Sequence, residues 1–116
     1  MANGPEIFDA VDRYYADDVT VVEADGQTFH GAATQKERIR EFLDSVKEMH
    51  GGGVQALAVH ETSPGTGVAF AEVSSDVEFH EGGRMQMEEV AVQTWKDGKV
   101  VHERFYYDMS GMPSEG

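Results

Sequence analysis

The sequence has no cysteine, only three prolines and no long apolar run, and these shortages exclude several classes of protein. Without cysteine the chain cannot form disulfides, bind a metal through thiolates or use a cysteine nucleophile. No run of about 18 apolar residues is present, so we expect no membrane span and no membrane partner. No basic and then apolar N-terminal stretch indicates a secretion signal. We therefore expect a cytoplasmic protein.

Basic residues are also scarce: 9 Lys and Arg stand against 22 Asp and Glu, which gives a net charge of −13. Nucleic-acid binding needs a cationic face that displaces phosphate counterions, so we do not expect a nucleic-acid partner. Two interpretations of the acidity stay open. It can provide a functional acidic surface, or it can be a halophilic adaptation to a salty cytoplasm, where screening weakens self-repulsion.

The length of 116 residues and the 40% apolar content fit one globular domain with a core of its own. We expect a single domain over 1–116 with an ordered core of about 5–109. Helical spacing of apolar residues predicts helices over 5–16 and 34–50, the second ended by three glycines. A short hairpin lies between them. Strands are predicted over 54–62, 67–80, 85–95 and 99–109. This order predicts an α+β domain.

Two segments carry a resemblance to a known family. The first is Tyr15-Ala16-Asp17-Asp18-Val19-Thr20-Val21, followed by Phe29-His30-Gly31 and a helix. The second is Trp95-Lys96-Asp97-Gly98-Lys99-Val100, followed by Arg104-Phe105-Tyr106-Tyr107-Asp108. Together they resemble the nuclear transport factor 2-like superfamily, in particular its polyketide-cyclase-like and ketosteroid-isomerase-like branches.

This resemblance implies a cystatin-like cone, in which a curved antiparallel sheet wraps around a long helix. We expect most of the family's usual first helix to be missing from this chain. Because the fold hosts isomerases, cyclases, dehydratases, hydrolases and non-enzymes, the resemblance indicates fold better than activity.

Two carboxylates are the catalytic candidates. Glu23 matches the position of the base of ketosteroid isomerases, and a carboxylate in an apolar cone can have a raised pKa and abstract a proton. Asp108 ends the Arg-x-Tyr-x-Asp stretch, and the matching aspartate of related branches is an acid or base. A solvated Glu23 beside a turn, and an Asp108 paired with arginine, are the plain structural alternatives.

Strict alternation along the predicted strands places four further residues on the face of Asp108: Arg104, Tyr106, Trp95 and Asp76. We expect them to bind substrate. The opposite face is the more apolar one, which favours it as the face that the helices cover. Which face lines the pocket stays open.

No metal site and no cofactor are expected. His60 and His102 lie on the first and fourth predicted strands, roughly 14 Å apart at the usual strand spacing. No pair of histidines has the spacing of metal ligands, and no phosphate-binding or dinucleotide motif is present.

We therefore predict a domain that binds a small apolar molecule between helix 34–50 and the sheet, with acid–base chemistry of the isomerase, cyclase or lyase type. The alternative is a non-catalytic ligand-binding or dimerisation module. A homodimer through the outer sheet face is expected, because two helices leave one half-apolar face uncovered. Tyr15 is predicted to be structural, with a paired hydroxyl.

Overall fold

The computed structural model describes residues 5–107, which form two helices and one sheet of six strands. The elements in chain order are α1 (Pro5–Tyr14), β1 (Tyr15–Val22), β2 (Thr28–His30), α2 (Ala32–Ser45), β3 (Val46–Ser63), β4 (Thr66–Phe79), β5 (Gly83–Lys96) and β6 (Lys99–Tyr107). The predicted α+β class is confirmed. Asp108, which the sequence places in the site, lies outside the described residues.

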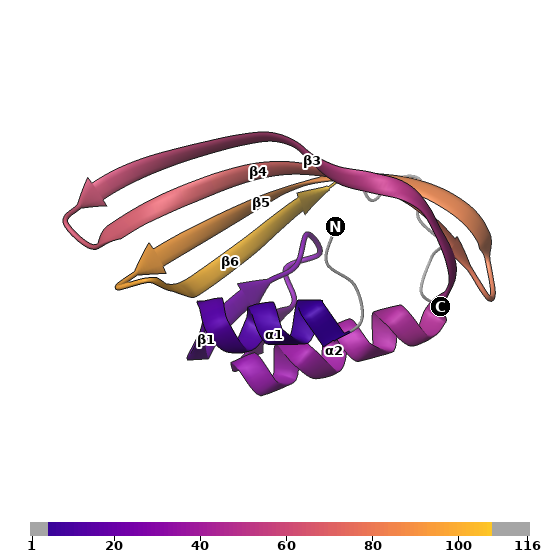
Figure 1. The fold of residues 1–116 in the computed structure, drawn as a ribbon, viewed down its shortest axis with the longest axis horizontal. Coiled ribbons are helices and arrows are strands. Elements are labelled where there is room, and N and C mark those ends of the chain that lie inside the picture. Colours follow the sequence, from indigo (N-terminus) through magenta and orange to yellow (C-terminus); the bar gives the residue numbers. More distant parts are fainter. Residues whose placement is uncertain (1–4, 108–116) are drawn as a thin grey trace.

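The strands are arranged in the order β2-β1-β6-β5-β4-β3. Neighbouring strands are antiparallel except β1 and β6, which are parallel. The sheet curves strongly, and both helices lie on its concave side (Figure 1). The sheet therefore has a concave face toward the helices and a convex face away from them.

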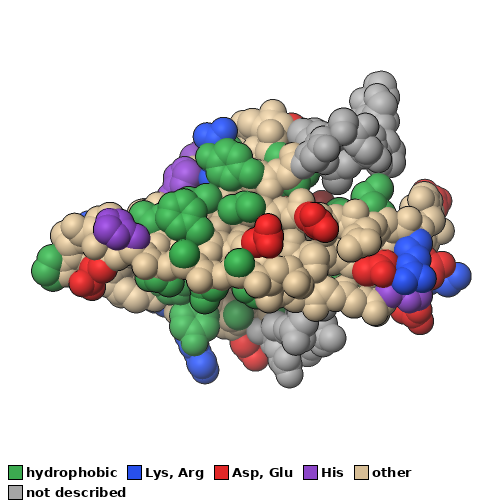
Figure 2. Space-filling view, turned by 90° about the horizontal axis from the view of Figure 1, so that it is seen from above, with side chains coloured by type: hydrophobic (Ala, Val, Ile, Leu, Met, Phe, Trp, Pro, Cys, Tyr) green, Lys and Arg blue, Asp and Glu red, His purple; other side chains and the backbone are tan. Residues whose placement is uncertain are grey.

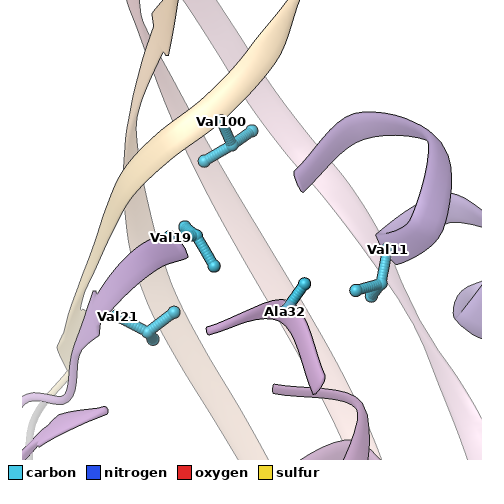
Figure 3. Packing of buried hydrophobic residues seen from close by; sticks show 5 residues of the cluster. All are labelled: Val11, Val19, Val21, Ala32 and Val100. Carbon is cyan, nitrogen blue, oxygen red and sulfur yellow. The ribbon is translucent and has the colours of Figure 1, made fainter. Parts of the chain in front are cut away.

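The hydrophobic core lies at one end of the sheet, where α1, the start of α2, β1 and β6 meet. Its buried members are Val11, Val19, Val21, Ala32 and Val100 (Figure 3). Tyr15, Ile39, Trp95 and Phe105 pack against this cluster. A fully buried valine contributes about 1.5–3 kcal/mol, so this small cluster provides much of the packing energy that joins the helices to the sheet.

The far end of the β3–β4 hairpin has no helix against it. Val54, Leu57 and Val59 of β3 are 62%, 65% and 71% exposed. The hairpin extends past the helices and makes the described part of the chain 45 Å long (Figure 1). Most of the buried apolar surface is consequently at the helix end.

The predicted helix 34–50 is too long at its C-terminal end. Helix α2 ends at Ser45, and Val46 already has extended dihedrals and begins β3. From there on the chain pairs with β4, starting with Val46 opposite Phe79. The hydrogen bonds of this ladder outweigh the helical spacing of residues 46–50, a case of tertiary pairing overriding local preference.

The glycines that were expected to end this helix lie inside β3 instead. Gly52 and Gly53 have φ angles of 140° and 150°, which residues with a side chain rarely adopt. The pairing of β3 with β4 shifts its register on either side of them. These glycines thus allow a long edge strand to bend across the curved sheet.

The sequence predicts turns at Ser63-Pro64-Gly65, Gly82-Gly83 and Asp97-Gly98, the last two as two-residue hairpin loops, and one of the three differs in the structure. Asp97-Gly98 connects β5 to β6 as a two-residue loop, since Lys96 pairs with Lys99. Pro64-Gly65 likewise connects Ser63 to Thr66. The turn at Gly82-Gly83 is longer than predicted, because Phe79 pairs with Gly83 and residues 80–82 form the loop.

One β-bulge decides which side chains of β6 face the helices. Val100 pairs with Trp95 but His102 pairs with Thr94, so Val101 is an extra residue on β6. A bulge shifts the alternation of side chains by one position. Glu103, Phe105 and Tyr107 therefore lie on the concave face, and the even-numbered residues of this stretch lie on the convex face.

Among the described residues, neither helix is long and apolar enough to cross a membrane.

The two β3 glycines offer a direct test of the bend. A Cβ on Gly52 would overlap the carbonyl oxygen of Ser74 on β4, whereas a Cβ on Gly53 meets nothing within 4 Å. We expect Gly53→Ala to lower the free energy of unfolding by about 1 kcal/mol through backbone strain alone. Gly52→Ala should cost at least about 2 kcal/mol, since strain and overlap act together. Urea unfolding of both variants measures the difference, and equal losses would contradict the bend described here.

Candidate functional site

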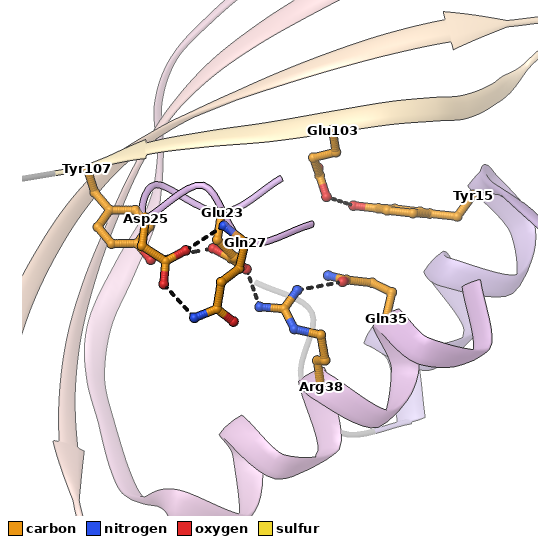
Figure 4. Close-up of polar contacts among 8 residues, drawn as sticks. All are labelled: Tyr15, Glu23, Asp25, Gln27, Gln35, Arg38, Glu103 and Tyr107. Carbon is orange, nitrogen blue, oxygen red and sulfur yellow. Dashed lines mark hydrogen bonds and ion pairs between the residues drawn. The ribbon is translucent and has the colours of Figure 1, made fainter. Parts of the chain in front are cut away.

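A buried carboxylate, Glu103, lies at the centre of the polar contacts on the concave face. Its side chain is only 2% exposed. The Tyr15 hydroxyl donates a 2.6 Å hydrogen bond to its Oε1 atom, and Gln93 Nε2 donates to its Oε2 atom. Trp95 Nε1 in turn donates to Gln93 Oε1 at 3.2 Å. Figure 4 shows the Tyr15–Glu103 pair above the first turns of α2.

A second carboxylate, Glu23, lies nearby at the end of β1. Arg38 of α2 donates to its Oε1 atom and forms an ion pair with it. The Tyr107 hydroxyl donates to its Oε2 atom at 3.4 Å. Arg38 also donates to Gln35 Oε1, and its guanidinium lies 3.8 Å from the centre of the Phe29 ring. Glu23 is thus neutralised by a well-held arginine (Figure 4).

A third carboxylate, Glu89 of β5, belongs to the same face. Its neighbours in the ladder are Tyr107 on β6 and Val73 on β4, which both lie on the concave side. It is partly buried. Among the hydrogen bonds and ion pairs of the described residues, none involves the Glu89 carboxylate, so this group differs from both Glu23 and Glu103.

Burial and mutual repulsion shift the acidities of these groups. Burial raises the pKa of Glu103, and nearby Glu23 adds to the rise, while the Gln93 and Tyr15 donors oppose it. Burial also raises the pKa of Glu89, with further contributions from Glu23 and Glu103. The pKa of Tyr15 rises for the same reasons, burial first and Glu103 second. Tyr15 therefore stays a proton donor at neutral pH.

Together these groups supply the components of acid–base chemistry. Glu89 is a carboxylate with a raised pKa and no donor among the described residues, which suits a general base. Tyr15 and Gln93 are neutral donors that hold Glu103 in place. We define the concave site as Tyr15, Glu23, Arg38, Glu89, Gln93, Glu103 and Tyr107.

The structure brings two of the predicted site residues to the concave side. Glu23 joins the concave site through Arg38 and Tyr107. Trp95 packs against the core and contacts Gln93 and the ring of Tyr14.

Three other predicted site residues lie on the convex face, away from Glu23. Arg104 and Tyr106 are exposed, with the Arg104 guanidinium 5.0 Å from the centre of the Tyr106 ring. Asp76 accepts two hydrogen bonds from Arg84, at 2.9 and 2.8 Å. The expectation that these three share one face with Trp95 is wrong. The bulge at Val101 reverses the alternation on β6, and the longer turn before Gly83 reverses it on β4.

Sequence reasoning missed Glu103, Gln93, Arg38 and the role of Glu89. Glu103 was assigned to the other face by strict alternation. One signal was available, since a buried Tyr15 needs an acceptor for its hydroxyl, and a search for that acceptor leads to the carboxylates of the final strand.

A group that could hold a metal lies far from the concave site. Ligand atoms of Glu48, His50 and Glu78 lie within 4.8 Å of one another. His50 Nε2 is 3.0 Å from Glu78 and Nδ1 is 3.1 Å from Glu48, while Lys47 lies 3.7 Å from Glu78. Both ring nitrogens and both carboxylates thus already have partners, and the cluster is accounted for as surface ion pairs.

The Tyr15–Glu103 bond can be tested by removing one hydroxyl. Tyr15→Phe leaves the buried carboxylate with one donor fewer, so we expect the free energy of unfolding to fall by about 2–3 kcal/mol. Tyr14→Phe is the matched control, because Tyr14 is exposed. Chemical denaturation of both variants measures the two losses. Equal, small losses would show that the hydroxyl contributes nothing to Glu103.

Glu89 predicts a specific dependence of stability on pH. Because its folded-state pKa lies above the ordinary 4.5, the folded protein keeps a proton that the unfolded chain releases as pH rises. Its contribution to stability is full below pH 4.5 and is lost as pH rises through the folded-state pKa. We therefore expect Glu89→Gln to become more stable relative to the unmutated protein as pH rises toward 7. Glu88→Gln, on the exposed convex side of β5, should show no such gain in thermal melts.

Comparison with known proteins agrees with this architecture. A family model for the SnoaL-like domain matches residues 1–107. A candidate SnoaL-like polyketide cyclase from Mesorhizobium loti superposes with a TM-score of 0.68 and 29% identity, covering 85% of this chain and 83% of that one. No functionally curated protein matches the chain.

More distant structures share the fold alone. A protein with a ketosteroid-isomerase-like fold from Catenulispora acidiphila, solved with trimethylamine, has a TM-score of 0.71 and 13% identity over 92% of this chain and 78% of that one. An epoxide hydrolase from M. tuberculosis, similar to limonene epoxide hydrolases, has a TM-score of 0.69 and 19% identity over 92% and 74%. The family model covers nearly the whole sequence, and the curved sheet with two helices on its concave side matches the cystatin-like cone. The chain therefore belongs to the SnoaL-like family.

Proposed function

We propose that this protein binds a small, largely apolar molecule on the concave side of the sheet and catalyses a proton transfer on it, with Glu89 as the general base. The observation that carries the proposal is the environment of the Glu89 carboxylate. It is a partly buried carboxylate with a raised pKa, and no described residue donates a hydrogen bond to it. A base of this kind combines access with a proton affinity above that of an ordinary carboxylate.

The other two carboxylates suit supporting roles. The Glu23 carboxylate is occupied by its ion pair with Arg38, and it acts on Glu89 through its charge. Glu103 has both oxygens occupied by donors. These contacts favour Glu89 over Glu23 as the proton acceptor.

The relatives support proton-transfer chemistry at the level of the fold. One is named for polyketide cyclisation and another for epoxide hydrolysis. Both names describe reactions in which acids and bases transfer protons. Because the fold also hosts proteins without activity, the proposal depends on Glu89 rather than on the family.

The test uses an apolar ketone, 2-tetralone, whose α-protons exchange with D2O when a base removes them. Methyl NMR shifts of Val73 and Val77, on the concave face, should report binding, while those of convex Val90 and Val92 should stay unchanged. Proton NMR should then show deuterium exchange faster than in buffer.

Glu89→Gln should bind the ketone and lose at least tenfold in exchange rate, and Glu88→Gln should retain it. Binding without accelerated exchange would contradict the catalytic role of Glu89 and would favour the alternative, a non-catalytic binding module. No shift at the concave methyls would contradict the proposed site itself.

A second proposal concerns the convex face, which we propose forms a homodimer interface. Paired positions on β3–β6 place an apolar group there, the convex patch: Ala56, Ala58, Phe70, Val90, Val92 and Tyr106. Figure 2 views this face and shows hydrophobic side chains gathered over it. A hollow of about 210 Å³ is lined largely by members of this patch. Phe70 and Tyr106 are 45% and 49% exposed, which is costly in water.

Light scattering at micromolar concentration tests the interface. We expect a dimer for the unmutated protein and a monomer for Phe70→Glu, which places a charge in the middle of the patch. Val59→Glu is the matched control, since Val59 is even more exposed than Phe70 but lies on the concave side of the same hairpin. A monomeric unmutated protein would contradict the proposal, as would loss of the dimer in the control alone.

A further inference from the structure

The concave site has more negative than positive charge. It holds three carboxylates, Glu23, Glu89 and Glu103, and they influence one another, since Glu23 and Glu103 both act on Glu89. One cation, Arg38, is present and is bound to Glu23. The donors to Glu103, Tyr15 and Gln93, are neutral. With all carboxylates ionised, the site therefore carries two uncompensated negative charges.

Six of the eight other Lys and Arg side chains have contacts elsewhere, and Arg13 lies over the Tyr14 ring of its own helix. Their partners lie on α1, within α2, or on the surface of the sheet: Lys36 with Asp12, Arg40 with Glu37, Lys47 with Glu78, Arg84 with Asp76, and Lys99 with the Arg13 carbonyl. Arg104 lies over Tyr106 on the convex face. The concave site thus obtains no second cation from these residues.

The site is also accessible and aromatic. The Glu23 and Arg38 side chains are 17% and 26% exposed, so solvent reaches this part of the concave site. Tyr107 and Phe105 follow Glu103 on the same face of β6, and Tyr15 lies opposite. Aromatic ring faces attract alkylammonium groups, and a carboxylate without a partner adds a direct charge contact.

From this charge balance we infer that the molecule bound at the concave site carries a positive charge, as a protonated or quaternary amine attached to a small apolar body. The cationic nitrogen lies beside Glu89 and the ring of Tyr107, and the apolar part lies against Val73 and Ala91. Phosphorylated and carboxylated compounds are disfavoured, because Arg38 is already occupied by Glu23. This inference rests on the proposed function and adds the charge class of its substrate.

Charge also explains why such a ligand suits a carboxylate base. Removal of a proton by Glu89 moves one negative charge from Glu89 to the ligand, which lies beside Glu23 and Glu103. A cationic nitrogen on the ligand offsets that charge, so a cationic ligand suits this base better than a neutral ketone such as 2-tetralone.

The test compares choline with 3,3-dimethyl-1-butanol, its neutral isostere with carbon in place of nitrogen. Methyl NMR titrations in 150 mM salt give a dissociation constant for each probe, measured at concave Val73 and at convex Val90. The salt and the convex reporter Val90 are essential controls, because a protein of net charge −13 attracts cations over its whole surface. We expect choline to bind at Val73 at least tenfold more tightly than the alcohol.

Glu89→Gln should reduce this preference at least fivefold, and Glu88→Gln, on the convex face of the same strand, should leave it unchanged. Equal binding of both probes at Val73 would overturn the charge inference and leave the proposed function standing. Shifts confined to Val90, or a preference lost in Glu88→Gln alone, would also overturn it. If neither probe, nor 2-tetralone, perturbs the concave methyls, the proposed function fails as well.

Discussion

The hydrogen bond between Tyr15 and Glu103 is the contact on which the rest of the polar site depends. It joins residues 88 positions apart and connects the start of β1 to β6. A carboxylate that is 2% exposed is expensive to bury, and two neutral donors offset that cost without cancelling its charge. The negative charge of Glu103 therefore stays close to Glu89 and Glu23. It acts on both more strongly than the charge of a solvated carboxylate would.

The helices cover only one end of the sheet, so the two ends of the sheet differ in burial and in what they can do. Near the core, the concave face is dry enough to shift acidities, as Glu103 and Glu89 show. Toward the tip of the β3–β4 hairpin, apolar residues such as Val59 and Phe70 remain exposed on both faces. One continuous sheet thus provides a site for chemistry at one end and apolar surface for association at the other.

Local signals in the sequence predicted much of the fold. Asp97-Gly98 identified a hairpin because both residues adopt positive φ there, and the apolar stripe of 5–16 identified the first helix. Long-range pairing was not predictable in this way. Residues 46–50 have helical spacing, yet their partners on β4 draw them into a strand.

The candidate site was harder to predict than the fold, for a geometric reason. Glu23 was predicted because, in the family resemblance, it matches the position of the base of ketosteroid isomerases. Glu103 was missed because the face on which a β6 side chain lies depends on the number of residues between the turn and that side chain. The extra residue in β6 changes this number by one. An extra residue leaves no mark in composition or periodicity, whereas its effect reverses the face of every side chain beyond it.

The bulge at Val101 also has an evolutionary meaning. Loss of that one residue by deletion would move Arg104 and Tyr106 into the concavity and would turn Glu103 and Tyr107 outward. The lineage could thereby exchange an acidic interior for a basic, aromatic one without any amino-acid replacement. In a fold with many unrelated activities, a single-codon insertion or deletion in a strand is a shorter route to new chemistry than a series of point mutations.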